Sequence, residues 1–368
     1  MGASMAYHLA KAGLRDVVLL ERESFFGQGA SGRNAGGIRY QFSTEINVRL
    51  SQLSLPMLEA FEEEIGQPID IRHCGYLFLL TNGADVESFQ QNVALQHRLG
   101  VQTEWLSPQE IRRRLPLMQL DDVLAGTWHA KDGIADPNGV VMGYVNAARR
   151  LGVRLVTDAT VTAIETQGGK ISAVVTNQGR IETPRIANAA GPWAASIGKM
   201  VDLDLPIVPI RRQWLTTTPL PEIPDDFPFV IDFAQSLYFH REGQGLLTGM
   251  SNPDQAPGID QSVDPEWELV AMEAAAKRLP LLEIAGVASR LAGLYEVTPD
   301  AHPILGSTPL EGFYLCAGFS GHGFMHGPIC GQLLAEEILN GRATTLNIDN
   351  LRFERFAGRH TPQEYNVV

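Results

Sequence analysis

The chain has 368 residues, 44% of them hydrophobic, and a formal net charge of −13 at pH 7. This length suggests about two domains, and the acidic charge argues against nucleic acid as a partner. The cysteines Cys74, Cys316 and Cys330 are scattered without a CxxC pair, which favours a reducing, cytoplasmic location and predicts no metal site. No apolar run approaches the roughly 18 residues of a membrane span, so we expect no transmembrane segment.

The chain begins with a predicted helix that ends near Gly13, followed by a predicted buried strand over residues 16–20 (DVVLL). A dinucleotide-binding βαβ unit runs from a strand through a G-x-G-x-x-G turn into a helix and a second strand that ends in an acid. Gly2 matches the third glycine of that turn, and Glu21 matches the acid that binds the ribose hydroxyls. The first strand and the first two glycines are missing, so we expect about 15 further residues in front of this sequence in the natural chain; any helix followed by a strand is the alternative.

The remaining sequence alternates between helix and strand signals. We expect helices at residues 47–65, 85–99, 107–114, 136–151, 267–279 and 329–339, and strands at 75–80, 153–156, 160–166, 170–176, 185–190 and 312–317. Residues 206–250 carry many strand signals. Nucleotide-type elements at the start, middle and end predict an α/β fold: a Rossmann-like domain in three pieces (1–72, 137–205 and 286–368) and an inserted antiparallel β-rich domain (73–136 and 206–285).

Four segments share one feature, a predicted strand end that runs into glycines or a turn. They are Glu21 into residues 27–37, Ala189 into Gly191, Leu294 into the turn at 300–303, and Ala317 into residues 318–323. Glycine lets the backbone approach a ligand closely, and a helix that starts after such a loop presents free N–H groups to negative charge. Any one segment could be an ordinary turn, but the four together indicate a ligand site.

Five ordered segments, LLERE, SGRNAGGIRYQFS, NAAGPWA, GLYEVTPDAHPILG and AGFSGHGFMHGP, span nearly the whole chain. They resemble the FAD-dependent amino acid oxidoreductase family of D-amino acid oxidase, glycine oxidase and the sarcosine oxidases. Within that family the chain is most similar to the branch of the sarcosine oxidase β-subunit, dimethylglycine dehydrogenase and L-proline dehydrogenase. The resemblance implies FAD as cofactor and a Rossmann-like FAD-binding domain of the glutathione-reductase type.

The resemblance also implies which residues hold FAD. The adenosine, pyrophosphate and ribityl parts would contact Gly2, Glu21, Arg22, Ser31, Gly32, Arg33, Asn34, Val161, Ala190 and Gly191. The flavin ring would lie near Gly36, Gly37, Ile38, Gly293, Gly321, His322, Gly323 and Phe324. The catalytic pocket would then include Arg39, Tyr238, Tyr295 and His322, with Gln213 and Trp214 as weaker candidates.

The implied reaction is oxidation of an amino acid C–N bond by hydride transfer to flavin N5. Arg39 would pair with the substrate carboxylate, since arginine binds carboxylates in bidentate fashion, and Tyr238 and Tyr295 would close the pocket over the amine. A secondary or tertiary amino acid such as sarcosine, dimethylglycine or proline is the first expectation, and a D-amino acid or glycine the second. Arg39 could instead pair with an acid at the surface, and Arg211-Arg212 is expected to be a polar loop from which one arginine could reach the substrate.

Departures from the family pattern refine these expectations. Gly293 stands where monomeric sarcosine oxidases carry the cysteine that tethers the flavin, and residues 29–39 contain no histidine for the alternative tether. We therefore expect noncovalent FAD. Met325 and Leu247 stand where the oxidases place lysines, and a cation near the flavin favours electron transfer to oxygen. The electron acceptor is expected to be oxygen, a quinone or a partner subunit in a hetero-oligomer, with a lean toward dehydrogenase behaviour.

Two rival interpretations remain open. A noncatalytic member of the family could act in assembly or binding without turnover, and the missing first strand gives that interpretation some support. An NAD-dependent dehydrogenase would explain Gly2 and Glu21 but leaves GLYEVTPD and the GHG segment unexplained. We rank it last.

Overall fold

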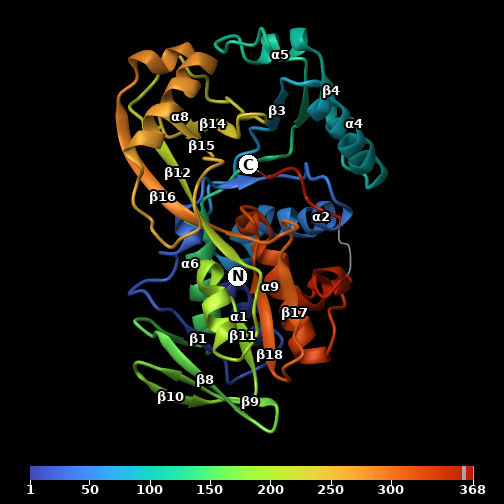
Figure 1. Cartoon of the computed structure of the whole chain (residues 1–368), viewed down its shortest axis with the longest axis vertical. Coiled ribbons are helices and arrows are strands. Elements are labelled where there is room, and N and C mark those ends of the chain that lie inside the picture. Colours follow the sequence, from blue (N-terminus) through green and yellow to red (C-terminus); the bar gives the residue numbers. More distant parts are fainter. Residues whose placement is uncertain (359–361, 368) are drawn as a thin grey trace.

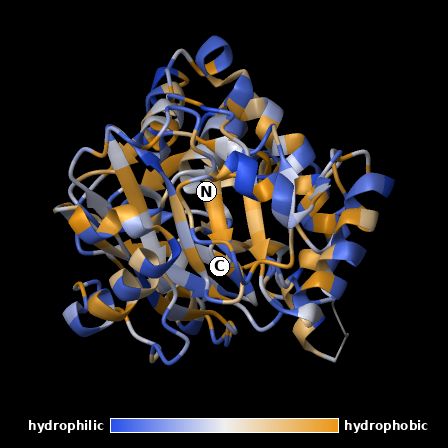
Figure 2. Ribbon diagram, turned by 90° about the horizontal axis from the view of Figure 1, so that it is seen from above, coloured by the Kyte–Doolittle hydropathy of each residue, from blue (hydrophilic) through white to orange (hydrophobic). Residues whose placement is uncertain are grey.

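The computed structural model describes residues 1–358 and 362–367. Its two halves follow each other along the long axis, with both ends of the chain near the middle (Figure 1). Apolar residues concentrate in the central strands, whereas the outer faces of the surrounding helices are largely polar (Figure 2). In the part of the chain that is described, no helix combines the length and apolar character needed to cross a membrane.

The first half is built from short parallel strands covered by helices. Strand β1 (Val18–Leu20) pairs in parallel with β7 (Arg154–Val156), and β11 (Ile186–Asn188) pairs in parallel with β18 (Phe313–Ala317). Strand β17 (Ile304–Ser307) extends the second group antiparallel to β18. Parallel pairs need crossover connections and covering helices. The helices of this half are α1 (Gly2–Lys11), α2 (Glu45–Glu59), α3 (Phe61–Ile65), α6 (Pro137–Arg150), α7 (Ala194–Lys199) and α9 (Gly323–Asn340).

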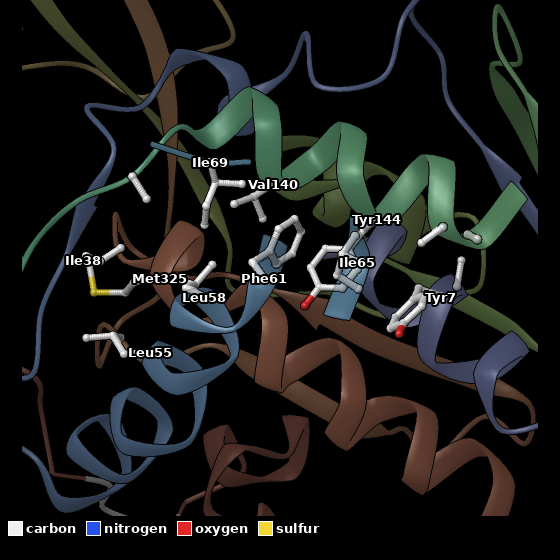
Figure 3. Close-up of a cluster of buried hydrophobic side chains, with 14 of the residues drawn as sticks. Tyr7, Ile38, Leu55, Leu58, Phe61, Ile65, Ile69, Val140, Tyr144 and Met325 are labelled. Atoms are coloured by element: carbon white, nitrogen blue, oxygen red, sulfur yellow. The ribbon is translucent and has the colours of Figure 1, made fainter. Parts of the chain in front are cut away.

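Helix α1 lies between α6 and α9 and shares its buried face with both. A Cβ at Gly331 would overlap Ser4, so α9 comes unusually close to α1 at this position. On the other side, Tyr7 packs against Tyr144 of α6, with ring centroids 5.4 Å apart (Figure 3). The predicted first helix is therefore fixed by tertiary packing on two sides.

A three-stranded antiparallel sheet extends the first half at its far end (Figure 1). It contains β8 (Val161–Gln167), β9 (Lys170–Thr176) and β10 (Gly179–Glu182). Gly168 and Gly169 both have positive φ, 60° and 77°, in the turn between β8 and β9. The hairpin predicted at these glycines is confirmed, because two successive positive φ values suit the tight turn.

The second half is an eight-stranded sheet in the order β16-β12-β15-β14-β13-β3-β5-β4. Its strands are β3 (Tyr76–Leu80), β4 (Glu104–Leu106), β5 (Ala125–His129), β12 (Val208–Thr217), β13 (Phe229–Asp232), β14 (Leu237–Glu242), β15 (Gly245–Met250) and β16 (Val287–Val297). All neighbours are antiparallel except β13 and β3. Helices α4 (Gly83–Arg98), α5 (Pro108–Arg114) and α8 (Pro265–Arg278) belong to this half. Strand β16, which the predicted domain division assigns to the Rossmann-like part, pairs with β12 along its length.

A two-stranded antiparallel pair links the two halves. It consists of β2 (Gly37–Ile38) and β6 (Gly133–Ile134). Ile38 is fully buried there, beside Leu55 and Met325 (Figure 3).

Three local predictions differ from the structure. The single helix expected at 47–65 is two helices that meet at Ala60, since Ala60 leaves helical geometry (φ −88°, ψ 7°). The last long helix begins at Gly323 rather than 329 and accommodates Pro328, because its buried face is held by the neighbouring helices. Arg211 and Arg212 lie in strand β12 rather than in a polar loop.

Candidate active site

One large cavity of about 1400 Å³ runs between the two halves of the molecule. Ordinary small-molecule pockets measure roughly 300–1,000 Å³, so this one has room for a ligand larger than a single small metabolite. One part, which we call the glycine-rich half, is lined by the start of α1, the end of β1, the Gly191 turn and the loop before α9. The other part, which we call the sheet half, is lined by one face of the eight-stranded sheet.

Two helix N-termini open into the glycine-rich half. Gly2 begins α1 and Gly323 begins α9, both line the cavity, and neither helix has a side-chain cap. Uncapped N-terminal N–H groups carry partial positive charge and suit a phosphate or a developing anion. Gly2 also lies tightly against β1, since a Cβ there would come within 3.2 Å of Leu19.

Glu21 follows the end of β1 and faces the same half of the cavity. Its Oε1 accepts a hydrogen bond from the Glu23 backbone N–H at 3.0 Å, and its backbone N–H donates to the Val156 carbonyl. Burial raises the pKa of the Glu21 carboxyl. Next to it, the Arg22 guanidinium lies 4.0 Å from the ring centroid of Trp193. A partly buried carboxylate at this place can accept hydrogen bonds from a pair of hydroxyls, as a ribose offers.

The imidazole of His322 is the most exceptional group in the cavity wall. The residue is 2% exposed, and neither of its ring nitrogens has a hydrogen-bond partner among the described residues. Burial, the neighbouring His326 and the positive charge of Arg39 hold the pKa of His322 well below its usual range, so the ring is neutral. Buried polar atoms without partners are rare in native proteins. The ring packs against Phe42 and His326 within the wall, with ring centroids 5.3 Å apart in each case.

The loop predicted to follow the ligand, residues 27–37, contains the 3-10 helix Ala30–Arg33. Ser31, Arg33, Asn34 and Gly37 of this loop line the cavity, whereas Gly32 and Gly36 do not. A Cβ at Gly32 would overlap the Gly27 carbonyl, so this glycine closes the loop on itself.

The other two expected ligand-side positions in this region also lie behind the wall. Gly36 has φ 73°, and a Cβ there would come within 2.6 Å of the Ala135 carbonyl oxygen. Ile38 belongs to the hydrophobic core (Figure 3). Gly36 and Ile38 therefore lie on the side of the loop that faces away from the cavity. Close backbone packing at Gly36 and core burial of Ile38 hold the loop in place.

The sheet half presents alternate residues of several strands. Arg212 pairs with Gly293 of β16, Trp214 and Tyr238 both pair with Gly249 of β15, and Tyr238 pairs with Ile231 of β13. Cross-strand partners point to the same side of a sheet, and of these residues Arg212, Trp214, Tyr238, Ile231 and Gly293 line the cavity. Gln213 points to the opposite side, where its amide exchanges hydrogen bonds with the Asp264 backbone.

Aromatic side chains close this half. Tyr76 stacks on Phe229 with ring centroids 4.2 Å apart and an interplanar angle of 12°. Burial raises the pKa of the Tyr238 and Tyr295 hydroxyls, so both remain protonated at neutral pH. A Cβ at Gly321 would overlap the Tyr295 ring, which shows how closely the loop before α9 approaches this tyrosine.

Arg39 is 5% exposed and lies at the edge where the two halves meet. Its guanidinium donates to the backbone carbonyls of Gln41 and Asn366 and lies 4.0 Å from the ring centroid of Phe42. No ion pair of Arg39 occurs within residues 1–358 and 362–367. Burial lowers the pKa of Arg39. A buried cation without a directly paired acid favours an anionic ligand.

Glu296 is a group that the motifs did not single out. It is partly buried in the cavity wall, and its Oε2 accepts a hydrogen bond from the Gly318 N–H at 2.9 Å. A Cβ at Gly191 would lie 3.7 Å from the same oxygen. Burial raises the pKa of Glu296 to about 7. This carboxyl therefore sits between two of the glycine turns and titrates near neutral pH.

The structure thus brings most of the predicted site residues to one cavity. Besides those already described, Val161, Ala190, Gly191 and Phe324 line it. Tyr76, Phe229 and Glu296 are cavity residues that sequence motifs did not identify as site residues, and Arg212 was expected only as one of two arginines in a loop. Only the pairing of strands far apart in sequence, such as β12 with β16, reveals them.

Comparison with known proteins agrees with this geometry. A family model described as FAD dependent oxidoreductase (DAO) matches residues 1–337. The solved structure of L-proline dehydrogenase from P. horikoshii superposes with a TM-score of 0.89 and 31% identity, covering 96% of this chain and 94% of that chain. This chain therefore belongs to the DAO family of FAD-dependent oxidoreductases, and FAD is its cofactor.

Two curated relatives give the range of similarity. Mitochondrial dimethylglycine dehydrogenase of Rattus norvegicus is 32% identical over 93% of this chain, which corresponds to only 42% of that protein. Sarcosine oxidase subunit beta of Arthrobacter sp is 26% identical, over 100% of this chain and 91% of that protein. The predicted α/β fold and the predicted family are both confirmed.

The residues present fit FAD on structural grounds. The open N-terminus of α9 lies at the cavity, and His322 stands in the wall just before this helix. The free N–H groups and the positive dipole end at the N-terminus of α9 suit the oxygen and nitrogen acceptors of a flavin ring. Glu21 and the start of α1 offer the corresponding partners for a ribose and a pyrophosphate.

Proposed function

We propose that this chain oxidises the C–N bond of a secondary or tertiary amino acid of the sarcosine, dimethylglycine or proline type. The observation that carries the proposal is the single cavity, which joins a dinucleotide-sized, glycine-rich half to a dry sheet half with arginine and tyrosine side chains. FAD supplies the hydride-accepting N5 when bound. The protein's own residues then have to bind, orient and desolvate the amino acid.

The substrate's charged groups suit the residues of the sheet half. Arg39 is proposed to bind the carboxylate, because it has no acid paired with it directly and stacks between Phe42 and Phe78. An amine must lose its proton before it gives up hydride. The aromatic wall of Tyr76, Phe229 and Tyr238 excludes water and so favours the neutral amine.

The neutral, buried imidazole of His322 is proposed to support the loop beside the flavin ring by packing against Phe42 and His326, rather than to carry a proton to the substrate. Its lowered pKa supports this role, since a proton carrier needs a pKa near the working pH. The N-terminus of α9 would stabilise negative charge on the reduced ring.

We propose that FAD is held without a covalent bond and passes its electrons to an acceptor other than oxygen. Gly293 offers no thiol, and a Cβ there would come within 2.9 Å of the Arg33 Cβ. Among the described residues that line the cavity there is no lysine, and Met325 is buried at the start of α9. The lack of a lysine where the oxidases that this chain resembles carry one supports a quinone or a partner subunit as acceptor.

The direct test is anaerobic reduction of the bound flavin. The FAD-loaded protein is mixed with sarcosine, dimethylglycine and L-proline, with glycine and D-alanine as comparisons, and the visible flavin band is followed. Bleaching by a secondary or tertiary amino acid at concentrations that leave the band unchanged with glycine supports the proposal. A flavin that stays oxidised with all five would contradict it. Acid precipitation of the protein separates free from covalently held flavin in the same sample.

A further inference from the structure

Arg212 stands out in the sheet half because nothing in the described chain neutralises it. Its Nη1 donates to the Arg211 carbonyl at 3.1 Å, but its Nε is buried and has no hydrogen-bond partner. No ion pair of Arg212 occurs in residues 1–358 and 362–367. Burial lowers the pKa of Arg212, and the groups that oppose this effect are the hydroxyls of Tyr295 and Tyr238.

The neighbouring arginine has the opposite surroundings. Arg211 points to the other side of β12, where its Nη1 lies 3.0 Å from Asp260 Oδ2 and its Nη2 lies 3.1 Å from Asp264 Oδ2. Strand alternation therefore gives one arginine two acids and the other none. A cation that is partly buried without an acid is costly unless a ligand supplies the negative charge.

The position of Arg212 fits a substrate contact. Its guanidinium carbon lies 5.3 Å from the ring centroid of Tyr295, and the residue faces the cavity from the strand position opposite Gly293. The hydroxyl of Tyr238 lies on the same face of the sheet. A guanidinium beside two protonated phenols is well suited to a carboxylate, because both supply donors to its oxygens.

Arg39 differs from Arg212 in its counter-charges. The negative charges of Glu364 and Asp132 act on Arg39 and oppose the effect of burial on its pKa. Its donors already reach two backbone carbonyls. Of the two arginines, Arg212 thus has the greater need of an external anion.

We propose that Arg212 binds a carboxylate of the substrate. The proposal rests on the amino acid chemistry proposed above, and the carboxylate has two possible sources. It is either the substrate's sole carboxylate, shared with Arg39, or the second carboxylate of a dicarboxylic amino acid. The first case makes Arg212 part of the general anchor, and the second makes it the residue that determines specificity.

The test measures anion binding without turnover. FAD-loaded protein is titrated at pH 7 with acetate and with malonate, and binding is followed by the flavin absorption spectrum and by tryptophan fluorescence, since Trp214 lines the same cavity. The variants are Arg212→Met and Arg212→Lys, with Arg211→Met as the control that removes the adjacent, acid-paired arginine. Thermal unfolding of each variant checks that it is folded.

We expect Arg212→Met to weaken at least one anion by about 10-fold or more, Arg212→Lys to restore part of the affinity, and Arg211→Met to bind as wild type does. Equal weakening of acetate and malonate identifies a shared, sole carboxylate, whereas weakening of malonate alone identifies a second one. Wild-type protein that binds neither anion, or an Arg212→Met variant that binds both within twofold of wild type, overturns the proposal.

The outcomes separate this inference from the proposed reaction. If no amine reduces the flavin but anion binding depends on Arg212, the reaction is wrong and the anion site stands. If an amine reduces the flavin but Arg212→Met binds both acetate and malonate within twofold of wild type, the reaction stands and the role of Arg212 is wrong.

Discussion

The two halves of the cavity recognise their ligands by different means. The glycine-rich half brings backbone close to the cavity, with helix starts at Gly2 and Gly323 and tight turns at Gly191 and Gly321. The sheet half is made of side chains that project from strands, among them Arg212, Trp214 and Tyr238.

This difference explains how one fold can serve many substrates. Backbone donors and close turns fit the one cofactor shared by the family and tolerate little change. Side chains on a sheet face can be exchanged without altering strand pairing, so substrate choice can change while the cofactor half stays fixed. Substitutions in the glycine-rich half should therefore reduce FAD binding, whereas substitutions in the sheet half should change substrate binding.

The largest effect is expected from Gly321→Ala in the glycine-rich half. The added Cβ would overlap the Tyr295 ring, and φ at this position is 96°, where non-glycine residues are strained by about 1–2 kcal/mol. We expect the loop before α9 to shift and the purified variant to lose most of its flavin. The ratio of visible to ultraviolet absorbance measures this loss.

Gly13→Ala is a matched control for that experiment. Gly13 has nearly the same φ, 97°, but a Cβ there meets nothing within 4 Å. The control therefore carries the backbone strain without the collision. Equal flavin content in the two variants would show that the close approach of Gly321 to Tyr295 is not needed for cofactor binding.

The next largest effect is expected from Arg278→Met, in the half of the molecule that contains the eight-stranded sheet but away from the cavity. Arg278 is 5% exposed and lies 2.6 Å from the fully buried Asp232 and 2.7 Å from Asp122. Removing it leaves the Asp232 carboxylate buried without its cation, which should cost about 3–5 kcal/mol of unfolding free energy. Denaturant unfolding measures the loss, and the flavin content of the remaining folded protein should stay unchanged.

The adjacent residue supplies the control. Lys277 pairs with Glu273 at 2.8 Å, but both side chains are more than 70% exposed. Lys277→Met should change the unfolding free energy by less than about 1 kcal/mol. If the two variants were equally stable, the buried pair would not be holding α8 to β13.

The same contrast between the halves explains what could be predicted from the sequence. Gly2 and Glu21 were identifiable because backbone recognition of a dinucleotide requires glycine and an acid at fixed spacing within one segment, and Gly191 was implied by the family resemblance of its segment. Tyr76 was not identifiable, and Arg212 could not be distinguished from Arg211, because their places in the cavity depend on pairing between strands far apart in the chain. Period-2 alternation shows that Arg211 and Arg212 point to opposite sides, but only the assembled sheet shows which side is the cavity.

Core positions were misjudged for a related reason. Ile38 follows two glycines in a motif that the family places near the flavin, yet it packs with Leu55 and Met325 in the core (Figure 3). Because neighbouring residues of a strand point in opposite directions, the position of Ile38 next to Gly37 does not show whether its side chain faces the cavity or the core.

A pH-dependent effect is expected where the two halves meet, at Glu296. Its pKa in the folded protein is raised from 4.5 to about 7, so the unfolded chain releases this proton at lower pH than the folded chain does. Below pH 4.5 the carboxyl is protonated in both the folded and the unfolded chain, so it does not lower the stability. Stability is lost as the pH rises from 4.5 through 7, because the unfolded chain releases the proton first. Glu296→Gln should remove this loss and gain about 2–3 kcal/mol over wild type at pH 8.

The measurement is denaturant unfolding of both proteins at several pH values from 4 to 8. The difference between them should be small at pH 4 and grow until about pH 7. A constant difference across this range would mean that Glu296 titrates normally and that the carboxyl is better solvated than its place beside Gly318 indicates.

The smallest effect in free energy is expected from Arg39→Met, and it should appear in KM. Losing a charge-assisted carboxylate contact costs about 1.5–3 kcal/mol, or roughly 10–100-fold in KM, while kcat and flavin content change less. Steady-state kinetics with the substrate found by flavin bleaching measures the split. An unchanged KM would leave Arg39 with only its backbone partners at Gln41 and Asn366.

The double variant Arg39→Met/Arg212→Met then decides how the two arginines divide the work. If both hold one carboxylate, removing the second after the first should cost little more, because the shared partner is already lost. If each holds its own carboxylate, the two effects on KM of a dicarboxylic substrate should multiply. Because Arg39 lies at the edge where the two halves meet and Arg212 projects from β12 of the sheet, non-additivity would show that one substrate carboxylate contacts both arginines.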